Sequence, residues 1–171
     1  NNVGYITWGD STSCVAEVAQ RSGRWHDVMQ MYRPQSVTGD VVSIYLEHGV
    51  SPKDKKYQYL ILPAVSETAV KNFNLSSIRV LHNDEGAQVV YLKEEKMYCI
   101  TAYQPISFIL TSGCPLDIYT PGIYMLREGG NCNIWCTDPT QDRDIINLKF
   151  NSKEVVIPLT GRKGQTININ L

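Results

Sequence analysis

The sequence predicts an all-β fold, an antiparallel β-sandwich, and three observations support this prediction. After SIRVLHN, which ends at residue 83, the chain shows about eight short apolar stretches in some ninety residues, each bounded by turn residues. The last stretch alternates cleanly, with Ile167, Ile169 and Leu171 on one face and polar residues between them. Helical spacing of any quality occurs in a single short segment.

The expected strands of this second half follow one another at short intervals. They are read, in order, from SIRVLHN, AQVVYLK, MYCITAY, ISFILTS, LDIYTPGIYMLRE, NCNIWCT, DIINLKF, KEVVIPLT and TININL. Between them stand turn signals rich in Gly, Pro, Asn and Asp, such as NDEG, GCP, EGG and TDPTQD. This spacing of strands and turns is typical of a sandwich.

The first half has longer strands. In VVSIYLEHG, Val42, Ile44 and Leu46 share one face, and YQYLILPA has the composition of a buried strand. We expect these two to form a hairpin with a long polar loop, VSPKDKK, between them. The helical candidate is SETAVKNF, where Ser66 can cap the N-terminus and Glu67 favours the first turn. A boundary is expected in NLSS, residues 74–77.

Composition is that of a folded protein, with 43% hydrophobic and 19% charged residues. A net charge of −1 gives no global field to recruit nucleic acid or anionic lipid, so neither is expected as a partner. No apolar run reaches the roughly 20 residues that a membrane span needs. We interpret the small basic clusters as solvated loop charge; they are Lys53, Lys55 and Lys56, Arg21 and Arg24, and Arg162 and Lys163. Because the chain opens on VGYITWG without Met or a signal segment, we expect it to be part of a longer protein.

Five cysteines give an odd count without a repeated spacing. Cys132 and Cys136 lie in one expected strand, where their Cα atoms would be roughly 13 Å apart, too far for a disulfide. The spacing also lacks the paired units of a zinc site. We interpret the cysteines mostly as small buried hydrophobic residues.

The stretch SGRWHDVMQMY sets His26 beside Asp27, with Trp25 before them. A His next to an Asp is a candidate oriented base, but a base also needs a partner and a substrate proton within reach. Neighbouring strand residues face opposite ways, so the pair is badly placed unless the strand bulges. We therefore expect Trp25 to be a packing residue and His26 to lie at the surface. His48, before Gly49, is interpreted as a turn residue with a hydrogen-bonded ring.

Tyrosines and aspartates offer two further candidate sites. YQY and YTPGIY could present a sugar-stacking platform, although tyrosines in a sandwich more often pack against the sheet faces. Asp138, Asp142 and Asp144 could indicate calcium, but they lack the spacing and the Gly of a calcium loop. Turn chemistry, with Asp before Pro in a short polar run, explains them better.

Five segments taken together resemble a known family. They are NNVGYITW, AQRSGRWHDV, VTGDVVSIYLEHGVSPKDKKYQYLILPAVS, IRVLHNDEGAQVVY and IWCTDPTQ, and they cover almost the whole chain. In order and spacing they resemble the C-terminal third of polysaccharide lyase family 8, which includes chondroitinase AC, hyaluronate lyase and xanthan lyase. The resemblance implies a three-part enzyme with an N-terminal α/α toroid, a central β-supersandwich and a small C-terminal β-sandwich. Residues 1–77 would be the C-terminal end of the central supersandwich, and residues 78–171 the C-terminal domain.

The resemblance also implies a reaction. Family members cleave acidic, uronic-acid-containing polysaccharides of the glycosaminoglycan type by β-elimination. A Tyr acts on the C5 proton, a His assists, an Asn neutralises the uronate carboxylate and an Arg supports the site. In the family these residues belong to the toroid, and no position of this sequence matches them. We therefore expect no catalytic, cofactor-binding or metal-binding residue here, no cofactor, and no activity from this chain alone.

By the same resemblance, the chain would be a scaffold that supports the substrate cleft of an extracellular or periplasmic lyase. Its partners would be the toroid of the same protein and an acidic polysaccharide similar to chondroitin or hyaluronan. Two alternatives stay open. The tyrosine content also fits a stand-alone carbohydrate-binding or cell-surface module, and a structural domain that has lost its enzyme is the third possibility.

Overall fold

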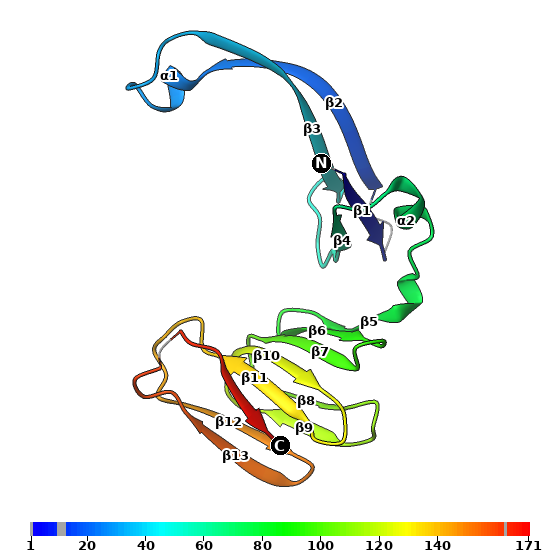
Figure 1. Ribbon diagram of the computed structural model, residues 1–171, viewed down its shortest axis with the longest axis vertical. Helices are drawn as coiled ribbons and strands as arrows, with labels where there is room; N and C mark the ends of the chain where they lie inside the picture. Colours follow the sequence, from blue (N-terminus) through cyan, green and yellow to red (C-terminus); the bar gives the residue numbers. More distant parts are fainter. Residues whose placement is uncertain (1, 10–12, 163) are drawn as a thin grey trace. The chain divides into compact units, whose positions relative to one another are not determined.

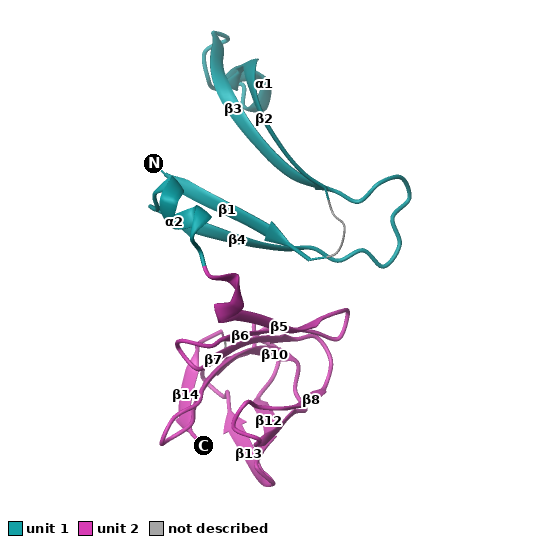
Figure 2. Cartoon of the chain, turned by 90° about the vertical axis from the view of Figure 1, so that its right-hand side faces the viewer, with its two compact units in different colours: residues 1–73 teal, residues 74–171 magenta. Residues whose placement is uncertain are grey.

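The structure is a computed structural model that describes residues 2–9, 13–162 and 164–171 (Figure 1). The chain divides into two compact units, residues 1–73 and 74–171 (Figure 2). All strand pairs in the described residues are antiparallel, which confirms the predicted fold class. No helix in this part of the chain has the length and apolarity needed to cross a membrane.

The first unit contains two separate strand pairs. β1 (Val3–Trp8) pairs with β4 (Gln58–Pro63), and β2 (Ser13–Arg24) pairs with β3 (Ser36–Glu47) along its whole length. The short helix α1 (Trp25–Val28) lies between β2 and β3. A strand pair of this length reaches roughly 40 Å at about 3.3 Å per residue.

The expected hairpin between β3 and β4 is wrong. β3 pairs instead with β2, the strand before it, and β4 pairs with β1. A tight two-residue turn would have fixed the partner locally, but the connection over residues 48–57 is long and sets no register. The partner is therefore chosen by contacts distant in sequence.

Helix α2 (Glu67–Lys71) confirms the predicted helix and its cap. The Ser66 hydroxyl accepts a hydrogen bond from the Ala69 amide at 3.2 Å. The helix approaches β1 so closely that a Cβ added at Gly4 would collide with the Val70 side chain. Glycine at this position is what allows the helix to pack on the strand.

The described residues of the first unit form no buried apolar core. Gly4 is the one buried residue among its described positions, and the large apolar side chains of β1, β3 and β4 are mostly exposed. An isolated two-stranded pair is marginal in water because it buries too little apolar surface. These strands therefore present faces that other structure would have to cover for the unit to be stable.

The second unit is a two-layer sandwich that follows a short 3-10 helix, η1 (Leu75–Ser77). Its first sheet has the order β14 (Ile167–Asn170), β11 (Asn133–Thr137), β10 (Gly122–Arg127), β7 (Met97–Ala102), β6 (Ala87–Leu92) and β5 (Ile78–Asn83). Its second sheet has the order β13 (Lys153–Pro158), β12 (Ile145–Phe150), β9 (Pro115–Ile118) and β8 (Ile106–Ile109). Residues alternate between buried and exposed along β10, as a strand with one covered face requires.

The core of this sandwich is continuous. Leu116, Ile118, Ile146 and Leu148 are fully buried from the second sheet, and they belong to one cluster with inward residues of the first sheet such as Tyr124. This unit therefore holds the apolar burial that the first unit lacks.

The stretch LDIYTPGIYMLRE, expected as one strand, is two strands in different sheets. β9 ends at Ile118 and β10 begins at Gly122, so the chain crosses between the layers at residues 119–121. At the crossing the Tyr119 amide donates to the Asn147 carbonyl, and the Asn147 amide donates to Thr120 Oγ1 at 2.9 Å. Pro121 has no N–H and cannot continue a sheet ladder, which explains why the strand ends here.

Candidate functional site

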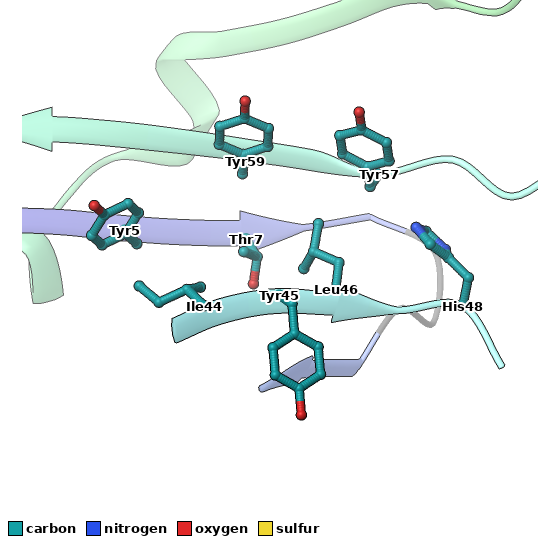
Figure 3. A pocket seen from close by; sticks show the side chains of 8 residues that line it. All are labelled: Tyr5, Thr7, Ile44, Tyr45, Leu46, His48, Tyr57 and Tyr59. Carbon is teal, nitrogen blue, oxygen red and sulfur yellow. The ribbon is translucent and has the colours of Figure 1, made fainter. Parts of the chain in front are cut away.

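A pocket lies on the first unit, where side chains of β1, β3 and β4 converge (Figure 3). Its volume is about 350 Å³. Most of its lining is aromatic or aliphatic, with a few hydroxyls and one imidazole; the residues are Tyr5, Thr7, Ile44, Tyr45, Leu46, His48, Tyr57 and Tyr59. A concave apolar lining with few polar groups is typical of small-molecule sites.

The alternation of β1 and β3 positions this lining. Ile44 and Leu46 point from β3 toward β1, and Tyr45 points to the opposite side (Figure 3). Tyr5 and Thr7 share a face of β1 for the same reason, two residues apart. Sequence reasoning missed the contribution of β1, although the alternation in GYITW was a signal that could have found it.

Two tyrosines form the aromatic side of the pocket. Tyr57 and Tyr59 have ring centroids 6.1 Å apart and ring planes inclined by 14°, so the rings are nearly parallel. Both rings rise from the same side of the chain with their hydroxyls pointing the same way (Figure 3). Each side chain is 55% exposed. For the YQY segment the structure therefore matches an aromatic platform, and the expectation that its tyrosines pack against a sheet is wrong.

His48 lies at the end of the pocket, between β3 and Gly49, whose φ is 79°. Its ring centroid is 5.9 Å from that of Tyr57, at an angle of 51°. The Nδ1 atom is buried and has no hydrogen-bond partner. His48 directly follows the end of β3, as expected, but no turn is assigned at this position and the expected hydrogen bond at this atom is not formed. A buried polar atom without a partner is unfavourable, and a ligand hydroxyl could satisfy it.

The loop that leads into Tyr57 is cationic. Residues 50–56 contain three lysines, Lys53, Lys55 and Lys56, and one carboxylate, Asp54. All of these residues are exposed. Ser51 and Asp54 both have positive φ, 51° and 53°, a backbone conformation that costs energy for residues other than glycine.

The SGRWHDVMQMY segment reverses the chain at the end of the β2–β3 pair. Residues 22–24 still belong to β2, but the strand geometry considered for His26 and Asp27 is wrong. Residues 25–28 form α1. Trp25 is 62% exposed and contacts Tyr32 with ring centroids 6.5 Å apart, so its prediction as a packing residue is also wrong. His26 is partly exposed, which agrees in part with its expected surface position, and its Nδ1 lies 2.9 Å from the Tyr32 carbonyl oxygen. The reason is that the chain reverses here, which exposes the indole and turns the imidazole toward the backbone.

No His–Asp dyad forms at this turn. Asp27 instead pairs with Arg24, with 3.0 Å between Nη2 and Oδ1, and both side chains are about half exposed. The hydrogen bond of His26 goes to a backbone carbonyl. The arrangement is that of a stabilised turn.

The Asp138 carboxylate organises the turn formed by the DPTQD segment. The carboxylate is 2% exposed and accepts hydrogen bonds from the amides of Thr140, Asp142 and Arg143, from the Thr140 hydroxyl and from the Arg143 guanidinium. Burial pushes the pKa of Asp138 upward, but the hydrogen bonds from Thr140 and Arg143 outweigh it and lower the pKa to about 2. The predicted turn chemistry is confirmed.

Three tyrosines of the second unit, Tyr91, Tyr98 and Tyr124, belong to its core. Tyr98 and Tyr124 are fully buried, and Tyr91 packs on Tyr98 with ring centroids 4.5 Å apart. The Tyr98 hydroxyl accepts from the Thr111 amide at 2.6 Å. YTPGIY therefore gives no platform, because Tyr124 points into the core.

The five cysteines are free. Cys136 is buried, and that burial raises the pKa of its thiol to about 11. Cys99, Cys114 and Cys132 are half-buried, while Cys14 is exposed and departs from the expectation. In the described residues no three His, Cys, Asp or Glu side chains are grouped so that they could hold a metal ion. The expectation that the chain carries no catalytic, cofactor or metal residue stays a prediction.

Two family models match the chain in succession. The super-sandwich domain of polysaccharide lyase family 8 matches residues 1–74, and the C-terminal beta-sandwich domain of the same family matches residues 79–147. Chondroitinase-AC of Pedobacter heparinus is 24% identical over 159 residues, which are 87% of this chain and 23% of that protein. Hyaluronate lyase of Thermasporomyces composti is 26% identical over 152 residues, 86% of this chain and 19% of that protein.

Solved structures show the same fold. A chondroitinase AC lyase studied as enzyme–oligosaccharide complexes superposes with a TM-score of 0.77 at 20% identity, over 98% of this chain and 28% of that one. A Paenibacillus xanthan lyase superposes with a TM-score of 0.77 at 17% identity, over 99% of this chain and 19% of that one. The chain thus spans less than a third of the length of these relatives. Together with the two consecutive family models, this shows that the chain belongs to polysaccharide lyase family 8, as a C-terminal portion made of super-sandwich and β-sandwich structure.

Proposed function

We propose that this chain is the non-catalytic C-terminal support of a lyase that cleaves acidic polysaccharides by β-elimination. The observation that carries the proposal is the consecutive match of two domains of one lyase family over residues 1–74 and 79–147. Residues 1–77 are assigned to the end of the central supersandwich and residues 78–171 to the C-terminal domain. The substrate is a uronic-acid-containing polysaccharide similar to chondroitin or hyaluronan, and the protein acts outside the cell or in the periplasm.

The exposed apolar side chains of the first unit agree with a structural role within a larger protein. In the first unit, Tyr5 of β1, Ile44 of β3 and Ile61 of β4 are between 38% and 48% exposed. Apolar faces of this kind are stable when further strands or helices cover them. The helical toroid and the earlier strands of the supersandwich are the partners we assign to these faces.

The chemistry supports the absence of a catalytic role. Removing the C5 proton of a uronate requires a base and a group that neutralises the neighbouring carboxylate, held together at the substrate. His26 is hydrogen-bonded to a backbone carbonyl, and His48 has aromatic neighbours without a nearby carboxylate in the pocket lining. We assign no residue of this chain to proton transfer.

Cleavage assays on two proteins test the proposal. One is the 171-residue chain, and the other is the longer gene product that contains it. Chondroitin and hyaluronan are supplied to each, and the ultraviolet absorbance of the unsaturated uronate product is followed. The longer protein is expected to produce the chromophore and the 171-residue chain none. Product formed by the 171-residue chain would contradict the supporting role, and a longer protein inactive on every uronate polysaccharide would contradict the lyase assignment.

The pocket favours a second candidate function, a carbohydrate-binding module. Its nearly parallel tyrosines, 6.1 Å apart at the ring centroids, are the observation in favour. The two functions are compatible, since a supporting domain can also hold the polymer.

A further inference from the structure

We infer that the Glu128 carboxylate is an acid-sensitive latch in the second unit. At neutral pH it holds the turn between β8 and β9, residues 110–114, against the end of β10, and it releases this turn when the surroundings become acidic. All the groups involved belong to the second unit, which has a continuous core of its own. The inference therefore stands independently of the lyase assignment.

The latch joins the two sheets of the sandwich. Glu128 directly follows β10 in the first sheet, whereas Thr111 and Ser112 lie in the turn between β8 and β9 of the second sheet. The Ser112 amide donates to Glu128 Oε1 at 3.0 Å, and the Thr111 hydroxyl donates to Oε2. One carboxylate thus accepts hydrogen bonds from two consecutive residues of the opposite layer, through both of its oxygens.

The Tyr98 hydroxyl completes the contact. It accepts a hydrogen bond from the Thr111 amide at 2.6 Å and lies 3.5 Å from Glu128 Oε2. The Tyr98 side chain is fully buried and packs on Tyr91, with ring centroids 4.5 Å apart. Leu110, at the start of the same turn, is also buried. Because the turn covers these side chains, its release would admit water to this end of the core.

The hydrogen bonds of Glu128 are tertiary, unlike those of two other carboxylates in the second unit. Asp138 accepts from residues at most five positions away, and Asp84 accepts from Gly86 and Ala87. The partners of Glu128 are 16, 17 and 30 positions away. Loss of the Glu128 charge therefore acts on a contact between the two sheets.

Acid weakens this contact because a protonated carboxyl group is a poorer acceptor. One of its oxygens then carries a proton, and hydrogen bonds to a neutral acceptor are weaker than those to a carboxylate. Burial raises the pKa of Glu128, but the hydrogen bonds from Ser112, Thr111 and Tyr98 outweigh it and leave the pKa below its ordinary value of 4.5. The latch is therefore complete above the unfolded pKa and is lost as pH falls through the folded pKa.

The groups that face Glu128 leave it as the titrating member of this network in acid. The phenol groups of Tyr91 and Tyr98 carry no charge at low pH. The turn between β6 and β7 also packs here, since the Lys96 carbonyl accepts from the Glu128 amide at 2.9 Å. The charged residues of this turn and of the adjoining end of β10 are all exposed; they are Lys93, Glu94, Glu95, Lys96 and Arg127.

NMR of the 171-residue chain between pH 7 and pH 3 tests the inference. Two quantities are followed: the amide proton shift of Ser112, and the protection of the Thr111 and Ser112 amides after correction for the intrinsic pH dependence of exchange. The Ser112 shift is expected to titrate with a midpoint below 4.5. Protection of the two amides should fall by about tenfold relative to the amides of β12, the size expected for losing one hydrogen bond to a charged group.

Two matched variants separate Glu128 from its neighbours. Glu128→Gln keeps the size of the side chain without the charge, so protection of the turn at pH 7 should already be as low as in the unmodified chain at pH 3, and it should not change with pH. Glu94→Gln removes an exposed carboxylate from the neighbouring turn and should leave the titration unchanged. Protected β12 amides show that each variant is folded.

Four results would overturn the inference. They are a Ser112 shift and protection that stay constant from pH 7 to pH 3, a full pH dependence retained in Glu128→Gln, a pH dependence abolished by Glu94→Gln, and a loss of protection shared equally by β12. The last result would mean that the whole unit, and not the turn, responds to acid. If Glu128→Gln does not fold, the titration of the unmodified chain and of Glu94→Gln decides.

Discussion

Asp138→Asn is expected to destabilise the second unit, because the buried carboxylate organises a whole turn. It accepts five hydrogen bonds, including those from the Thr140 hydroxyl at 2.7 Å and the Arg143 guanidinium at 3.0 Å. An asparagine has nearly the same shape, but its NH₂ group would face donors that need an acceptor, and the charge opposite Arg143 is lost.

The magnitude follows from the pKa. Hydrogen bonding lowers the pKa of Asp138 to about 2 against burial, from an ordinary value of 3.8. The difference between these two pKa values corresponds to a contribution of about 2 kcal/mol to the free energy of unfolding. Because the folded pKa is depressed, this contribution is complete above the unfolded pKa near 4 and is lost as pH falls through about 2. Roughly half of it should remain at pH 3.

Hydrogen exchange of the β10 and β11 amides measures this free energy in the second unit without requiring the whole chain to unfold in one step. Asp138→Asn should lower it by about 2 kcal/mol at pH 7 and by roughly half as much near pH 3. Asp142→Asn, an exposed carboxylate in the same turn, should change it by less than about 0.5 kcal/mol. The reasoning fails if Asp138→Asn matches this control, or if its effect is the same at pH 7 and pH 3.

Three further changes test the packing. Leu116→Ala, at a fully buried core position, should lower the free energy of unfolding of the second unit by about 3 kcal/mol in the same exchange experiment, whereas Val156→Ala, 63% exposed, should cost well under 1 kcal/mol. Gly4→Ala should detach α2 from β1, since its Cβ would collide with that helix, and faster amide exchange in residues 67–71 would show it. The exposed Cys14 should react with a maleimide at neutral pH far faster than Cys136, whose pKa burial raises to about 11; equal rates would contradict the burial.

Local features were determined by the sequence alone. The alternation along Ile167, Ile169 and Leu171, the Ser66 cap and the Asp138 turn each depend on residues within a few positions of one another. Their physical causes, side-chain alternation in a strand and short-range hydrogen bonds from side chain to backbone, are encoded in the order of the residues. For that reason the antiparallel sandwich and most of its strands could be predicted.

Tertiary structure alone decided which strands pair and which side chains meet. β3 pairs with β2 across the turn that holds α1, and Pro121 divides one apolar stretch between two sheets. His48 has an unpaired Nδ1 because β3 ends beside Tyr57, a proximity that no local pattern records. Strand pairing and pocket formation depend on contacts between residues far apart in the chain, where long connections leave the register free. The sequence by itself therefore determined most strands of the second unit and the family, and the fold decided the pairing, the division at Pro121 and the pocket.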